Sequence, residues 1–100
     1  NLFRHKVGAS VAAVRRSGGL PTIDTLNHYI TYSEMFMPSA NYWTVAHGRE
    51  PGEMEQDAEG KQIMEVLGRN MAWLMKVIEA GSTKVSPPAR VDKIATNFIR

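Results

Sequence analysis

Two segments of the sequence carry residue types from which small-molecule sites are built. In the first, two arginines and a serine precede a pair of glycines, whose missing side chains let backbone N–H groups approach a planar polar ligand closely. The second segment adds an amide and two large rings suited to stacking on such a ligand. We expect one binding site formed by Arg15, Arg16, Ser17, Gly18, Gly19, Asn41, Tyr42 and Trp43.

The same patterns also fit plainer structural roles. Arg15 and Arg16 are charges of the kind that follow a buried strand, and spacing alone favours a simple turn because Arg-Arg-Ser-Gly-Gly is not a specific motif. Tyr42 and Trp43 are at least equally suited to anchoring a loop on the core or to a subunit contact. For these two rings, local spacing does not decide between the structural role and the binding role.

Several other chemistries lack support in this sequence. With no cysteine, the chain has no disulfide, no thiolate metal site and no cysteine nucleophile. The three histidines, His5, His28 and His47, are scattered without metal-ligand spacing. No serine lies in a Gly-x-Ser-x-Gly turn. The sequence therefore predicts neither a metal centre nor a hydrolase, and it does not identify catalytic residues.

The first half of the chain predicts a strand, a helix and a second short strand. Residues 7–14 are an unbroken run of small and β-branched residues, typical of a parallel strand buried on both faces, with a buried helix as the alternative. Apolar residues three and four apart predict a helix over residues 21–34. Residues 35–37, before Pro38, predict a short strand at the rim of the sheet.

The second half predicts a long loop, a long helix and a tail. Residues 39–52 have no clear period and are expected to form a loop. The helix is predicted from about residue 57 to Gly81, with acidic residues grouped at its start. Residues 82–100 are expected to pack on their own domain or on a second subunit. The order of elements predicts an α/β fold with a parallel sheet.

Composition bounds the function further. The chain has 100 residues, 43% of them hydrophobic, and a formal net charge of +2. The charges alternate along the chain, so we expect neither nucleic-acid binding nor, without a long apolar run, a membrane span. The absence of a signal-peptide pattern and of cysteine is compatible with the cytoplasm. Because a buried-type strand follows the start so soon and no initiator Met is present, we expect the chain to begin within a larger domain.

Several stretches, read together, resemble the NAD(P)H-dependent FMN reductase family of flavodoxin-like proteins. They are KVGASVAAVRRSGG (6–19), LNHY (26–29), MFMPSANYW (35–43), DAEG (57–60) and LGRN (67–70). The branch they resemble is that of the iron-sulfur-flavoprotein-like reductases, related to quinone reductases first described as tryptophan-repressor-binding proteins.

The resemblance implies a flavodoxin-like sheet of order 2-1-3-4-5, to which this chain contributes the last two βα units. It further implies that residues 15–19 lie beside the pyrimidine ring of FMN and that the loop around residues 41–43 forms another wall. The family's phosphate-binding loop and central flavin loop are absent from this sequence, so the resemblance implies weak or no FMN binding by this chain alone.

The resulting hypothesis is an FMN-dependent oxidoreductase. It would take hydride from NAD(P)H and pass electrons to a small-molecule acceptor such as a quinone or a flavin, and it would form a homo-oligomer in the cytoplasm. The alternative is a flavodoxin-like electron-transfer or interaction module without nicotinamide turnover.

Overall fold

The computed structural model describes residues 1–99, and Arg100 lies outside the described residues. Its elements are β1 (Ala12–Val14), α1 (Gly19–Tyr32), β2 (Val45–His47), a short 3-10 helix η1 (Glu53–Gln56) and α2 (Ala58–Gly81). The two strands are parallel, with Ala12 opposite Val45 and Val14 opposite His47. This confirms the α/β class, and the two βα units are consistent with part of a flavodoxin-like domain.

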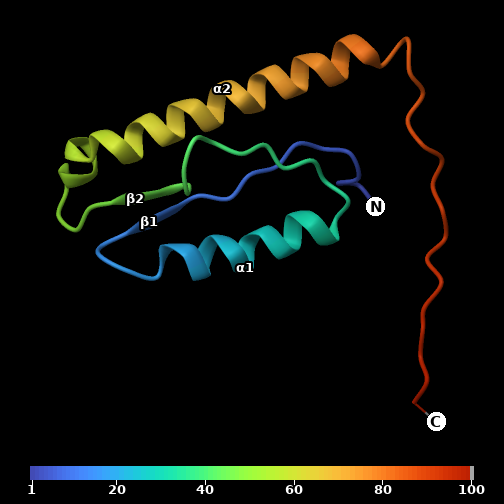
Figure 1. Ribbon diagram of the computed structural model, residues 1–100, viewed down its shortest axis with the longest axis horizontal. Coiled ribbons are helices and arrows are strands. Elements are labelled where there is room, and N and C mark those ends of the chain that lie inside the picture. The colour runs from blue at the N-terminus through green and yellow to red at the C-terminus, as the bar shows by residue number, and fades with distance from the viewer. Residues whose placement is uncertain (100) are drawn as a thin grey trace.

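The helices lie on opposite sides of the strand pair (Figure 1). On the α1 side, the hydroxyl of the buried Ser10 donates a hydrogen bond to the side-chain oxygen of Asn27. On the α2 side, the first turns of the helix pack on Ala46, since a Cβ at Gly60 would lie 3.1 Å from Cα of Ala46. The buried hydrophobic core is small and consists of Ala12, Ile23, Ala46, Ile63 and Leu67.

The strand predicted over residues 7–14 is interrupted, so its predicted length was wrong. Val7 pairs with Phe36 in a single parallel bridge, and regular pairing resumes only at Ala12, opposite Val45. Four residues (8–11) separate the two pairings on one side and eight (37–44) on the other. The longer segment, here called the insertion (residues 37–44), therefore leaves the sheet. It rejoins at Thr44, whose carbonyl accepts from the Ala12 N–H at 3.0 Å.

The second strand lies elsewhere than predicted. Of residues 35–37, only Phe36 pairs with the first strand, through its one bridge. The regular second strand is β2, which lies inside the segment 39–52 that was predicted to be a loop. A strand of three residues is too short to show a period, and pairing with β1 is a contact distant in sequence. Both predictions were wrong for this reason.

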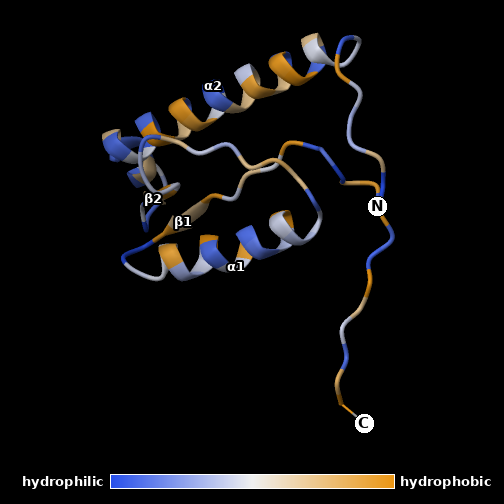
Figure 2. Ribbon diagram, turned by 45° about the vertical axis from the view of Figure 1, so that its right-hand side comes forward, coloured by the Kyte–Doolittle hydropathy of each residue, from blue (hydrophilic) through white to orange (hydrophobic). Residues whose placement is uncertain are grey.

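The two helices were located closely by their apolar periods, which Figure 2 shows as recurring hydrophobic residues along each of them. The helix predicted over residues 21–34 is α1, which begins and ends two residues earlier. Pro21 thus lies in the first turn, where a backbone N–H has no helical partner to lose. The chain then reverses at Glu34, which has a φ of 56°. The helix predicted over residues 57–81 is confirmed as α2.

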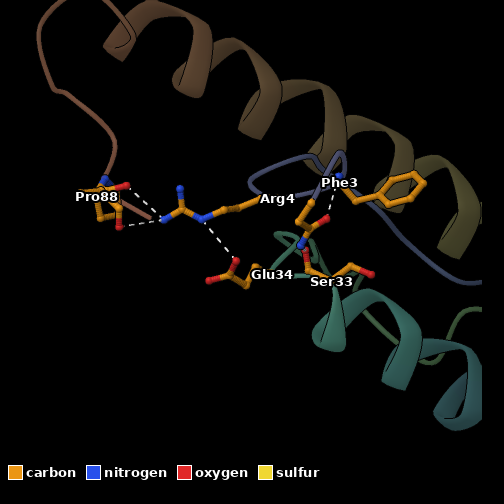
Figure 3. A network of polar contacts seen from close by, with 7 residues as sticks. Phe3, Arg4, Ser33, Glu34 and Pro88 are labelled. Carbon is orange, nitrogen blue, oxygen red and sulfur yellow. Dashed lines mark hydrogen bonds and ion pairs between the residues drawn. The ribbon is translucent and has the colours of Figure 1, made fainter. Parts of the chain in front are cut away.

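The C-terminal tail extends away from the two βα units (Figure 1). Residues 86–99 form neither helix nor strand, and all of them are exposed. Near its base, Pro88 and Ala89 accept hydrogen bonds from Arg4 (Figure 3). Its predicted packing on the domain or on a second subunit remains a prediction. Within residues 1–99, no helix has the length and apolar character needed to cross a membrane.

Candidate functional site

A groove of about 370 Å³ opens where both strands end and both helices begin. Val14 and His47, the last residues of β1 and β2, contribute to its floor. Its volume lies in the range of small-molecule sites. The remaining lining residues come from the β1–α1 turn, the first turn of α1, the insertion, β2 and the start of α2: Arg16, Ser17, Gly18, Gly19, Leu20, Pro21, Tyr42, Trp43, Val45, Asp57, Glu59, Gly60 and Ile63.

The structure brings together six of the eight residues predicted from sequence. Arg16, Ser17, Gly18, Gly19, Tyr42 and Trp43 all line the groove. The other two, Arg15 and Asn41, are exposed and are not among the lining residues. The Asn41 amide nitrogen instead lies 3.5 Å from the side-chain oxygen of Gln62 on α2. The sequence could not tell which of Arg15 and Arg16 lines the groove, because that depends on the course of the backbone through the turn.

The β1–α1 turn presents backbone donors to the groove. Gly18 has a φ of 88°, in the left-handed region that favours glycine. Gly19 packs so closely on β2 that a Cβ there would lie 2.6 Å from Cγ1 of Val45. No side chain caps α1, and no acidic residue lies in its first turn. The free N–H groups and the positive end of the helix dipole are therefore open to an acceptor group of a ligand.

Two aromatic rings from the insertion form the wall beside this turn. Tyr42 and Trp43 line the groove, and their ring centroids are 6.1 Å apart with the planes inclined at 52°. More than half of each residue is exposed, at 62% and 56%. A hydrogen bond of 2.8 Å from the Asn70 side chain to the Ser39 carbonyl ties the insertion to α2. The wall is thus held in place while its rings stay accessible for stacking.

The opposite wall contains an acid that was not predicted as a site residue. Asp57 precedes α2 and accepts hydrogen bonds from the Gly60 N–H at 2.9 Å and the His47 N–H at 2.8 Å. These two bonds, in that order of importance, lower the pKa of the Asp57 carboxyl below its usual value. The sequence signal was available, because an aspartate just before an apolar helical period is a typical N-cap.

The loop between β2 and α2 is ordered by a second carboxylate. Glu53 accepts hydrogen bonds from the N–H groups of Arg49, at 2.8 Å, and Glu50, at 3.1 Å. These bonds lower the pKa of the Glu53 carboxyl. In the part of the chain that the structure describes, no group of three or more histidines and acids is placed to hold a metal ion.

Comparison with curated proteins finds an iron-sulfur flavoprotein from Methanocaldococcus jannaschii that is 30% identical over 84 residues. The similarity covers 77% of this chain but 44% of the archaeal protein, so the chain spans less than half the length of that relative. No family model matches the sequence, and no solved structure shows significant similarity.

Proposed function

We propose that the groove is one part of a flavin site and that the protein is a flavin-dependent oxidoreductase. The observation that carries this proposal is the meeting of Arg16, the uncapped start of α1 and the rings of Tyr42 and Trp43 around a single groove. A flat, largely apolar ring system with polar atoms along one edge fits these surroundings. The similarity to an archaeal protein named as a flavoprotein supports the same ligand class.

Each part of the groove would hold a different part of the flavin. The N–H groups at the start of α1 would donate to acceptor atoms on the edge of the ring system. The guanidinium of Arg16 would favour the negative charge that this edge acquires on reduction. Tyr42 and Trp43 would cover the apolar part of the ring. The bound flavin would supply the redox chemistry, accepting and returning a hydride equivalent.

The finer form of the proposal follows the sequence resemblance. The flavin is FMN, the electron donor is NADH or NADPH, and the acceptor is a quinone, a flavin or a similar small molecule. The protein would act in the cytoplasm. Since this chain spans less than half of its flavoprotein relative, the activity belongs to the whole protein and not to these residues alone.

Arg16 and Arg15 provide a matched pair of variants for testing the flavin site. Arg16 lines the groove and its neighbour does not, although their side chains are identical. At about 5 Å and an effective dielectric near 20, an arginine and a reduced flavin attract by ~3 kcal/mol, and exposure to water reduces this. We expect Arg16→Ala in the full-length protein to weaken binding of reduced FMN about tenfold more than that of oxidised FMN. This difference lowers the two-electron potential by about 30 mV.

The measurements are FMN fluorescence titration and redox potentiometry, with Arg15→Ala as the control. Equal effects of the two substitutions would contradict the assignment of the groove. A full-length protein that purifies colourless and takes up no added FMN would refute the flavin proposal itself. Turnover of NADPH with a quinone then separates the oxidoreductase from an electron-transfer module, which would bind FMN without consuming the nicotinamide.

A further inference from the structure

The hydrogen-bond ladder of the sheet has a gap opposite the insertion, and the backbone N–H of Ser10 lies in this gap. Two residues before it, the N–H of Gly8 donates to the Phe36 carbonyl at 2.9 Å. Two residues after it, the N–H of Ala12 donates to the Thr44 carbonyl at 3.0 Å. Alternate residues of a strand turn their N–H groups to the same side, so the N–H of Ser10 faces the insertion as well. Within residues 1–99 this N–H donates no hydrogen bond.

The carbonyl of Ser10 supports this orientation, because the N–H and C=O of one strand residue point to the same side. It accepts a hydrogen bond at 2.7 Å from the hydroxyl of Thr44, at the end of the insertion. Ser10 is only 8% exposed. Buried backbone N–H groups nearly always have a partner, so we expect an acceptor from outside the described chain to meet this donor.

The gap opens into a cavity of about 200 Å³ that is separate from the groove at the strand ends. Ser10 lines the cavity from the sheet, Asn27 lines it from α1 and Leu67 lines it from α2. The insertion forms the remaining wall, which includes the rings of Tyr42 and Trp43. These two rings also line the groove, so the two hollows share one wall.

The insertion is held in a way that keeps this cavity open. Its eight residues stand opposite the four residues 8–11, so the ladder cannot close over the gap. Near one end, the Asn70 side chain on α2 donates to the Ser39 carbonyl at 2.8 Å. At the other end, Thr44 is bonded to Ser10. The insertion is thus anchored at both ends.

The lining indicates the chemistry of a ligand. None of the residues that line the cavity carries a charge, which favours a neutral molecule. The side-chain oxygen of Asn27 accepts from the Ser10 hydroxyl, while its NH2 group makes no hydrogen bond within residues 1–99 and is a second donor. Two donors suit one carbonyl oxygen, which has two lone pairs. A cavity of about 150 Å³ holds benzene, so this one admits a single six-membered ring.

We propose that this cavity is a second small-molecule site, which binds a neutral single-ring compound through one carbonyl oxygen. The oxygen accepts from the N–H of Ser10 and the NH2 group of Asn27, and so completes the ladder where the insertion leaves it. The ring lies between the two helices. Ser10 and Asn27 do not line the groove, so binding here does not depend on a flavin there.

The test compares acetophenone with α-methylstyrene, in which a CH2 group replaces the carbonyl oxygen. Each is titrated into the isotope-labelled full-length protein, and the backbone amide signals are followed by NMR. Acetophenone should bind with a dissociation constant of about 1 mM or below and shift the Ser10 amide proton downfield. The amides of Gly8 and Ala12 are already bonded and should shift less. α-Methylstyrene should not move the Ser10 amide downfield.

Asn27→Asp tests the second donor. It keeps an acceptor for the Ser10 hydroxyl but replaces the NH2 group by an oxygen that repels a carbonyl. It should weaken acetophenone binding at least about tenfold and α-methylstyrene binding less than about threefold. The matched control is His28→Asp, which adds a carboxylate at an exposed position of α1 outside the cavity and should change neither affinity.

Two results would overturn the site. The first is a Ser10 amide that acetophenone leaves unmoved in the wild-type protein, which means that water or another segment of the full-length protein occupies the gap. The second is an equal effect of Asn27→Asp on both ligands, which removes the carbonyl contact. A protein that takes up no FMN but shows the Ser10 shift would refute the flavin proposal and leave this site standing.

Discussion

Gly18 gives the sharpest test of the β1–α1 turn. The space around it would admit an added methyl group, whereas its backbone conformation disfavours one. Its φ is 88°, and apart from the residue itself and its two chain neighbours, nothing lies within 4 Å of the position where a Cβ would stand. Sterically, therefore, alanine fits. The cost of Gly18→Ala comes only from the left-handed backbone, at about 1–2 kcal/mol.

Gly68 in α2 is the matched control. A Cβ there would also meet nothing within 4 Å, but the residue lies inside a regular helix. Gly68→Ala should stabilise the protein by about 0.5–1 kcal/mol, because alanine loses less backbone freedom on folding. The two substitutions thus differ in sign, and together they separate the unfolding constants by about 30-fold for ~2 kcal/mol.

The assay is urea unfolding followed by far-ultraviolet circular dichroism. With a slope of about 1–3 kcal/mol/M, Gly18→Ala should lower the midpoint by roughly 0.5–1 M and Gly68→Ala should raise it by less. Gly18→Asn should keep most of the stability, because asparagine tolerates the left-handed region. A Gly18→Ala variant that is as stable as the wild type would show that the turn does not require a positive φ, and a destabilised Gly68→Ala variant would remove Gly68 as the control.

Three further predictions concern the wall of the groove that contains Asp57, Gly60 and Ile63. The pKa of Asp57 is lowered in the folded protein, so its stabilising effect is present above its unfolded pKa near 3.8 and is lost as the pH falls through the folded pKa. Asp57→Asn should therefore make the urea midpoint of unfolding less dependent on pH between pH 7 and pH 3. Ile63 is only 3% exposed, so Ile63→Ala should lower the free energy of unfolding, measured in urea, by about 2–5 kcal/mol. Val77 is exposed, and Val77→Ala should lower it by less than about 1 kcal/mol. Gly60→Ala should lower the melting temperature, because its Cβ would clash with the carboxylate of Asp57 and would lie 3.1 Å from Cα of Ala46; an unchanged value would contradict this close packing around the start of α2.

The sequence located what depends on near neighbours. The apolar period from Ile63 to Ile78 placed α2, and the pair Gly18-Gly19 placed the turn before α1, because helix faces and turn conformations depend on residues a few positions apart. The same local reading selected residues 15–19 and 41–43 as site candidates, and six of these eight line one groove. Their role in binding a flavin remains a prediction.

What the sequence could not determine is how distant segments pair. The bridge of Val7 to Phe36, the departure of the insertion and the return of the chain at Val45 all depend on register against a strand more than 25 residues away. That register brings Tyr42 and Trp43 to the groove from within the insertion and not from the end of a strand. It also aligns the His47 N–H with the Asp57 carboxylate. Residue types and local spacing thus determined which groups are suited to a site. Tertiary pairing decided which of these groups meet, because the residues around one strand do not indicate which distant residues its backbone will pair with.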